Sequence, residues 1–88
     1  MTPEEQCAEV ARLNPDWLPF PMAPTSLQHR FQGCWIGQPG TGPNLWRAYK
    51  TPGYGWPMRT RSDAARSFRS PASAIRALGY IVIEEDSP

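Results

Sequence analysis

Hydrophobic and polar residues follow a helical period at the beginning of the chain. Residues Thr2 to Glu5 read Thr-Pro-Glu-Glu, in which threonine suits the cap, proline suits the first turn and glutamate completes a capping box. Apolar residues follow at helical spacing. Asn14 and Pro15 end the pattern, because proline disfavours helical geometry in the residue before it. This pattern predicts a helix over residues 1–14.

The same start signal recurs near the end of the chain. Residues 70–79 begin with Ser-Pro, continue with an apolar face and close on a glycine, which together predict a second, shorter helix. The apolar run from Tyr80 to Ile83 then predicts a buried strand over residues 80–84, followed by an acidic tail at 85–88.

Proline interrupts the pattern over residues 15–26, which we expect to form an extended connector. Its large apolar side chains include Trp17 and Phe20. Packing against the core is the favoured prediction, because a small chain has few large apolar residues to bury. The alternative is that this segment presents Trp17 and Phe20 to a partner.

Residues 27–69 are expected to form a hairpin and the rest of a sheet. Leu27 to Ile36 alternates as a strand does, Gly37 to Pro43 is dense in turn formers, and Asn44 to Thr51 supplies a second strand. Residues 58–68 are ambiguous, since they contain both a helix-favouring alanine pair and a possible third strand. The order of elements predicts one small α+β domain over residues 1–88, with helices packed on an antiparallel sheet of three to four strands.

Composition supports a folded chain. Hydrophobic residues make up 40% and charged residues 19% of the 88 positions, a balance too apolar for general disorder. The apolar runs are far shorter than the ~20 residues that a membrane span requires. The first residues lack the basic and apolar regions of a secretion signal. These observations predict a cytoplasmic protein that does not enter a membrane.

Charge is segregated along the sequence, although the net charge is only +1. Between Trp17 and Ile83 there are eight basic residues and one acid, Asp63, which leaves that interval at +7. The other acids lie at the two ends of the chain. A local excess of this size attracts anionic partners even when the whole molecule is nearly neutral.

The sequence contains little that indicates a catalytic or metal-binding site. His29 is the only histidine, and Cys7 and Cys34 lack a paired-cysteine zinc spacing. We expect both cysteines to be reduced and packed as small hydrophobic residues. The glycines of the Gly37–Pro43 loop fit no phosphate-binding motif, because two predicted strands flank the loop. The sequence therefore predicts a protein that is not an enzyme and holds no metal or cofactor.

Basic and aromatic residues interleave in the middle of the chain. Arginine and lysine neutralise phosphates, and aromatic faces stack on unpaired bases, so this combination is typical of surfaces that bind single-stranded nucleic acid. Acidic protein surfaces would accept the same cations. The opposing interpretation assigns the tryptophans to the core and the arginines to the solvated surface. The predicted binding residues are Arg30, Trp46, Arg47, Tyr49, Lys50, Tyr54, Trp56, Arg59 and Arg61.

The short, arginine-dominated and motif-free sequence resembles the small accessory proteins that bacteriophages and mobile elements encode. This resemblance implies a stoichiometric binding protein, such as an inhibitor of a host defence or regulatory complex. The leading hypothesis is binding to nucleic acid, or to machinery that handles it. The alternatives are a protein–protein inhibitor or adaptor with exposed aromatic anchors, and an oligomer that sequesters a small ligand or nucleotide. The sequence leaves the oligomeric state open.

Overall fold

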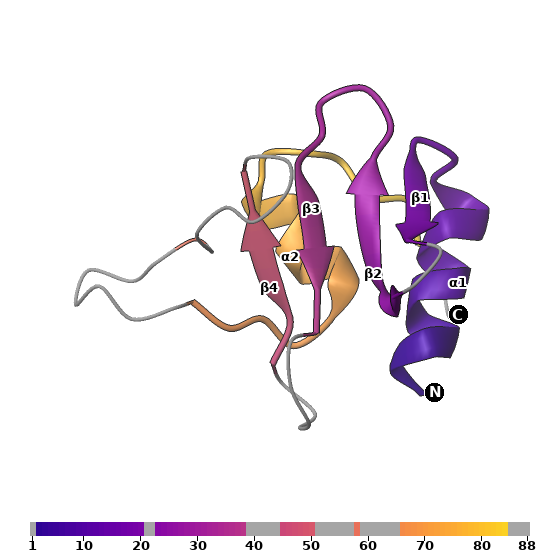
Figure 1. Ribbon diagram of the computed structural model, residues 1–88, viewed down its shortest axis with the longest axis horizontal. Helices are drawn as coiled ribbons and strands as arrows, with labels where there is room; N and C mark the ends of the chain where they lie inside the picture. Colours follow the sequence, from indigo (N-terminus) through magenta and orange to yellow (C-terminus); the bar gives the residue numbers. More distant parts are fainter. Residues whose placement is uncertain (1, 21–22, 39–44, 51–57, 59–65, 85–88) are drawn as a thin grey trace.

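The computed structural model describes residues 2–20, 23–38, 45–50, 58 and 66–84 of the chain. Its described elements form an α+β fold of helices packed on an antiparallel sheet (Figure 1). In chain order they are α1 (Pro3–Leu13), β1 (Trp17–Phe20), β2 (Ala23–His29), β3 (Trp35–Gly37), β4 (Arg47–Tyr49) and α2 (Pro71–Ala77). The predicted fold class is confirmed.

Both predicted helix starts are present. At α1, Glu5 N–H donates to Thr2 Oγ1 at 3.2 Å and Thr2 N–H donates to the Glu5 carboxylate at 3.1 Å, which completes the capping box. At α2, Ser70 Oγ accepts the Ser73 N–H at 3.1 Å. These caps satisfy backbone donors that have no partner within the first turn of a helix.

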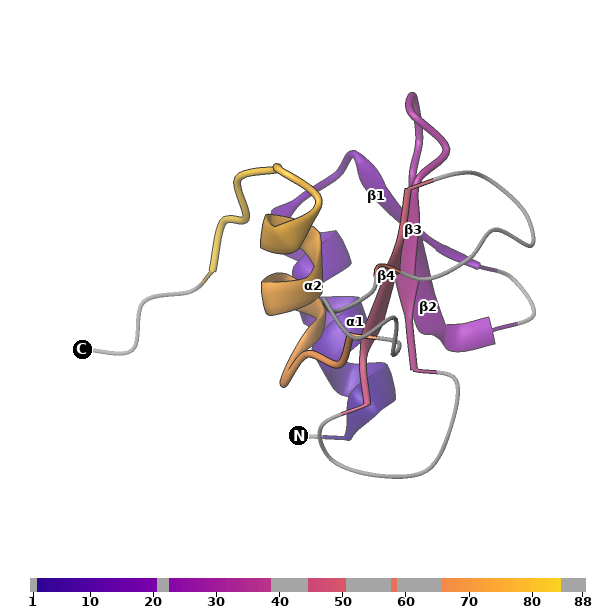
Figure 2. The same cartoon turned by 90° about the vertical axis from the view of Figure 1, so that its left-hand side faces the viewer.

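The sheet is an antiparallel meander in the order β1-β2-β3-β4. Helix α1 packs against β1 and β2, and α2 packs against β3 and β4. Figure 2 shows that both helices lie on the same face of the sheet. The core fills the space between this face and the helices, where Leu27, Ile36 and Ala48 are fully buried. We call the opposite side of the sheet the helix-free face.

The segment predicted as one strand from Leu27 to Ile36 is instead two strands joined by a turn. His29 N–H donates to Cys34 C=O at 2.8 Å, and Gly33 N–H donates to His29 C=O at 3.1 Å. Gly33 has φ 74°, a left-handed conformation that costs glycine little. The strand-like alternation of residues continues through this turn without a break, so the sequence pattern did not predict the turn. The second predicted strand, 44–51, is shorter than expected, with β4 covering Arg47–Tyr49.

The proline-rich segment 15–26 is also different from its prediction as a connector, because it contains β1 and the first part of β2. Proline lacks a backbone donor and is tolerated mainly in edge strands, and β1 is the edge strand of this sheet. Trp17 is buried in the core, as the favoured prediction had it. Phe20 is half-buried.

The predicted C-terminal strand over 80–84 is wrong. This segment joins no strand of the described sheet and continues instead over the helical side of the molecule (Figure 2). Gly79, at φ 96°, redirects the chain after α2. Val82 is buried, whereas Ile81 and Ile83 are exposed. Most of the uncertain region 58–68 lies outside the described residues, and its last residue, Phe68, forms a bridge with Trp46.

Candidate binding surface

The helix-free face follows from the pairing register. Leu27, Ile36 and Ala48 are aligned across β2, β3 and β4 and point towards the helices. Because successive side chains of a strand point to opposite faces, their neighbours occupy the other side of the sheet. One aligned row on that side consists of Gln28, Trp35 and Tyr49.

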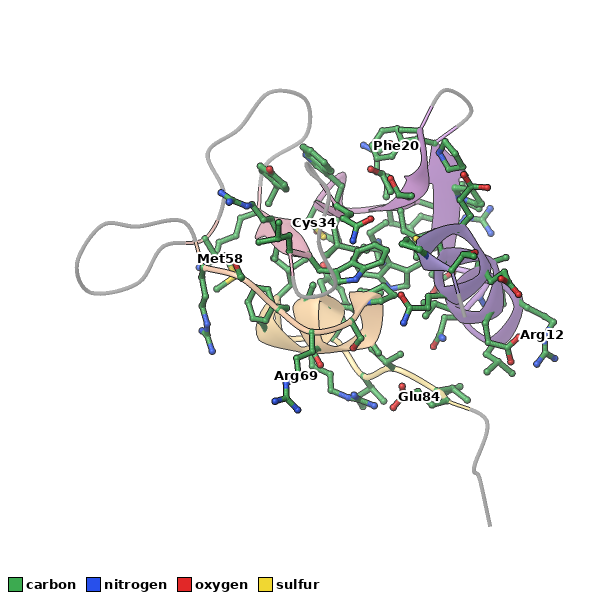
Figure 3. All side chains as sticks on the ribbon, turned by 90° about the horizontal axis from the view of Figure 1, so that it is seen from below. Arg12, Phe20, Cys34, Met58, Arg69 and Glu84 are labelled. Carbon is green, nitrogen blue, oxygen red and sulfur yellow. The ribbon has the colours of Figure 1, made fainter. Side chains whose placement is uncertain are left out.

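Three aromatic rings pack together on this face. The rings of Trp35 and Tyr49 are stacked, with centroids 3.8 Å apart and planes within 2° of parallel. Phe20 meets Trp35 edge-on, with centroids 5.7 Å apart at 83°. Figure 3 shows Phe20 projecting from the sheet on the side away from α2. We call Phe20, Trp35 and Tyr49 the aromatic row. Trp35 and Phe20 are half-buried and Tyr49 is buried.

A second aligned row, which contains two small residues and an arginine, lies beside the aromatic row. Ser26, Gly37 and Arg47 are aligned across β2, β3 and β4. A Cβ atom at Gly37 would lie 2.5 Å from Ser26 Oγ and 3.2 Å from the Trp35 ring. Glycine is therefore required here by the close approach of its neighbours.

Arg47 and Lys50 bring positive charge to β4. Arg47 is half-buried, and its buried Nε atom has no hydrogen-bond acceptor among the described residues. Lys50 is exposed at the other end of the strand, next to Tyr49. An unsatisfied donor on a buried cation costs free energy, about 1–3 kcal/mol or more, which an acceptor from a ligand would recover. The position of Arg47 thus favours an anionic or acceptor-rich partner.

Among the described residues, ion pairing involves only part of the basic interval between Trp17 and Ile83. Glu9 pairs with Arg12 on α1, and Glu84 pairs with Arg76 at 2.6 Å on the helical side. In the described ranges, the basic residues between Trp17 and Ile83 other than Arg76, which we call the central cations, have no carboxylate within ion-pairing distance. Arg30 and Arg66 lie over the rings of Phe31 and Phe68. These central cations are Arg30, Arg47, Lys50, Arg66 and Arg69.

The central cations do not all face the same way. Arg47 is the first residue of β4, Lys50 follows the last residue of β4, and Arg30 lies in the turn between β2 and β3. The register places Arg30 and Lys50 beyond the same end of the sheet, whereas Arg47 lies near the other end. Arg69 is on the helical side of the molecule (Figure 3). The helix-free face therefore gathers part of the predicted basic surface.

The predicted aromatic binding residues lie in different parts of the structure. Trp46 has no exposed surface and belongs to the core, where its indole N–H finds no acceptor in the part of the chain that the structure describes. It is therefore unavailable for a surface contact. Tyr49 is on the helix-free face, as part of the aromatic row. Tyr54, Trp56, Arg59 and Arg61 lie outside the described residues.

Trp35 and Phe20 were not among the predicted binding residues. Alternation through a single long strand placed Trp35 on the same face as Leu27. The four-residue turn after His29 reverses this relation, so that odd positions of β2 share a face with even positions of β3. The glycine at position 33 was the one sequence signal that identified this turn.

The remaining reactive groups are buried. Cys7 and Cys34 are both free and buried, in agreement with the expectation of reduced, packed cysteines. Burial raises the pKa of the Cys7 thiol to about 12. Cys34 Sγ–H donates to Tyr80 Oη at 3.6 Å. This contact, followed by burial, raises the pKa of the Tyr80 hydroxyl.

Two further observations concern only the described ranges. No cluster of three or more histidine, cysteine or acidic residues there has the arrangement of a metal site. No described helix has the length and apolar character needed to span a membrane. Comparison of the chain with protein-family models, curated proteins and solved structures found no match.

Proposed function

We propose that this protein is a non-enzymatic binding protein that engages single-stranded nucleic acid, or the machinery that handles it, through the helix-free face of its sheet. The observation that carries the proposal is the aromatic row, with Arg47 on the same face and Lys50 following Tyr49 in the chain. Neither cation has an ionic partner in the described ranges. We propose further that the protein acts in the cytoplasm and is one of the small accessory proteins that bacteriophages and mobile elements encode.

Two physical terms support binding at this face. Stacking of a base on an aromatic side chain contributes about 1–3 kcal/mol and tolerates any base sequence. The half-buried Trp35 and Phe20 are the residues of the aromatic row that retain exposed surface for such contacts. Phosphate contacts by Arg47 and Lys50 add a term that depends on salt, because each contact releases counterions from the strand.

The experiment is a fluorescence-anisotropy titration of a labelled single-stranded oligonucleotide at several salt concentrations. The variant Arg47→Gln/Lys50→Gln should weaken binding and lower the slope of log affinity against log salt by about 1.4, since each single-strand phosphate contact contributes about 0.7. Trp35→Leu should weaken binding at every salt concentration without changing that slope. Arg12→Gln, on the exposed side of α1, is the control and should bind normally. Unchanged affinity and slope in the double variant would refute the proposal.

A second function has its own supporting observation. Leu18, Phe31 and Ile81 are large apolar residues with 48%, 70% and 91% of their surface exposed. Exposed apolar residues of this size are typical anchors of protein–protein contacts, which favours an inhibitor or adaptor of a protein complex. Binding to a purified protein that persists at high salt after nuclease treatment, and that Phe31→Ser weakens, would establish this function. Loss of all binding after nuclease treatment would reject it.

A further inference from the structure

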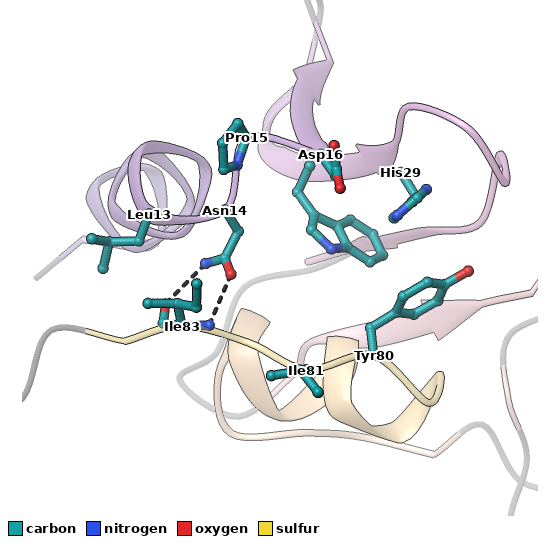
Figure 4. Close-up of a pocket in the computed structure, with 9 residues that line it drawn as sticks. Leu13, Asn14, Pro15, Asp16, His29, Tyr80, Ile81 and Ile83 are labelled. Carbon is teal, nitrogen blue, oxygen red and sulfur yellow. Dashed lines mark hydrogen bonds between the residues drawn. The ribbon is translucent and has the colours of Figure 1, made fainter.

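A cavity of about 250 Å³ lies apart from the aromatic row, where the end of α1, the start of β1, the end of β2 and the C-terminal segment meet (Figure 4). Its lining includes Asp16, Trp17, His29 and Tyr80, together with the apolar side chains of Leu13 and Ile81. Among the lining residues there is no lysine or arginine. The cavity is therefore chemically different from the basic surface described above.

Three aromatic rings fix the shape of one wall. The His29 ring is stacked on Tyr80, with centroids 4.8 Å apart and planes at 29°. Trp17 meets His29 edge-on at 5.1 Å and Tyr80 edge-on at 5.5 Å. Asn14 holds the opposite boundary, since its side chain exchanges two hydrogen bonds with the Ile83 backbone at 2.9 and 2.8 Å. The cavity thus exists before any ligand enters.

Two hydrogen-bond donors on this wall are left over. His29 Nδ1 accepts the N–H groups of Phe31 and Gln32 at 3.2 Å each, so the ring proton is on Nε2. Trp17 and His29 are only 3% and 8% exposed. In the described part of the chain, neither Trp17 Nε1–H nor His29 Nε2–H has an acceptor. A ligand that displaces solvent from these two N–H groups must therefore supply acceptors in its place.

The donors and the Asp16 carboxylate restrict the chemistry of the occupant. An anion would face Asp16 with no cation in the lining, and a cation would face two N–H donors. A purely apolar group would leave both donors without partners, which is unfavourable. A neutral ring that accepts from Trp17 and His29 and donates to Asp16 satisfies all three groups. We propose that this cavity binds an uncharged, amide-containing planar heterocycle of the nucleobase type.

This inference is independent of the proposed function, because it uses different residues and a different part of the molecule. A heterocycle of this kind is available either as a free nucleoside or as an unpaired base within a strand. Both carry the same ring chemistry, so the two sources are distinguished by the form of the probe.

The test is a titration of ¹⁵N-labelled protein with uridine, guanosine, inorganic phosphate and a short uridine oligonucleotide, followed by nuclear magnetic resonance. The indole N–H signal of Trp17, assigned by its loss in Trp17→Phe, should shift and saturate with a nucleoside and should not respond to phosphate. Saturation with the nucleoside identifies a free-ligand site. A response to the oligonucleotide alone identifies capture of a base from a strand.

Variants then test each assigned contact. Asp16 is exposed, so Asp16→Asn should fold normally. It should weaken the binding of uridine about three- to tenfold, because the amide oxygen still accepts a hydrogen bond but no longer carries a charge. Glu4→Gln, another exposed acid, is the matched control and should bind as the unmodified protein does. Trp17→Phe keeps an apolar ring and removes the donor, so its affinity should fall by a similar factor.

Two results would overturn the inference. One is the absence of any change in the Trp17 indole signal with nucleosides or oligonucleotide at millimolar concentration. The other is equal affinity in the unmodified protein, Asp16→Asn and Trp17→Phe. Arg47→Gln/Lys50→Gln separates this site from the proposed function, because that variant should retain nucleoside binding whether or not the helix-free face binds a strand.

Discussion

Asn14 connects the end of α1 to the C-terminal segment, and its replacement tests how that segment is held. Its side-chain amide donates to the carbonyls of Val10 and Ile83, both at 2.9 Å, and its side-chain oxygen accepts the Ile83 N–H at 2.8 Å. Asn14 is also buried. Two of these bonds hold Ile83, and the segment 80–84 is held in addition by Cys34 at Tyr80 and by Arg76 at Glu84.

Asn14→Ala removes three hydrogen bonds, each with a net value of about 0.5–1.5 kcal/mol. Part of this loss is recovered when the freed backbone of the exposed segment is hydrated. We therefore expect the free energy of unfolding to fall by about 2 kcal/mol, which lowers the Tm of a chain of this size by about 8–16 °C. The Ile83 amide should also exchange with solvent much faster, because it loses its acceptor.

Thermal unfolding followed by circular dichroism measures the first effect, and hydrogen exchange at Ile83 measures the second. Gln6→Ala is a suitable control, since it alters another half-buried polar residue of α1 for which no side-chain hydrogen bond is described. Asn14→Asp should be at least as harmful as Asn14→Ala at neutral pH, because a carboxylate cannot donate to the two carbonyls. Stability within about 0.5 kcal/mol of the unmodified protein, a difference typical of neutral surface substitutions, together with unchanged exchange at Ile83, would refute this account.

Three further predictions concern a cap, a thiol and a glycine. The Thr2 N–H, which donates to Glu5, lowers the pKa of that carboxyl from 4.5. In denaturation series, Glu5→Gln should therefore be less stable than the unmodified protein above pH 4.5, and this difference should shrink as the pH falls below that value. The Cys7 thiol, whose pKa is raised to about 12 by burial, should react with a disulfide reagent at pH 8 only after denaturant is added, and rapid reaction of the native protein would contradict its burial. Gly37→Ala should destabilise the sheet by about 1–3 kcal/mol through overpacking. Calorimetry should show a smaller loss when Ser26→Ala removes the Oγ atom at 2.5 Å, and equal losses in both backgrounds would exclude this contact as the cause.

The helices are the elements that the sequence specified most completely. Thr2 and Ser70 cap α1 and α2 as their local sequence predicts, because a cap depends on residues within one turn of the helix. The cysteines were also predicted to be free and buried. In each case the relevant physical information is contained in a few neighbouring residues or in their general chemistry.

The sheet and the candidate surface depended on contacts between distant residues. A turn between His29 and Cys34 placed Trp35 opposite to the face that simple alternation gave it, since one change of register exchanges the two faces of a strand. Trp46 and Tyr49 lie within one short stretch of sequence, yet the first is in the core and the second is on the helix-free face.

Sequence by itself therefore determined the α+β class, both helices and the segregation of charge. Tertiary structure alone decided which aromatic rings stack on the sheet, that Tyr80 meets His29 and Trp17 around a cavity, and that Asn14 holds Ile83. The physical reason is that helix caps and charge are local properties, whereas stacking and cavity formation require residues far apart in the chain to meet.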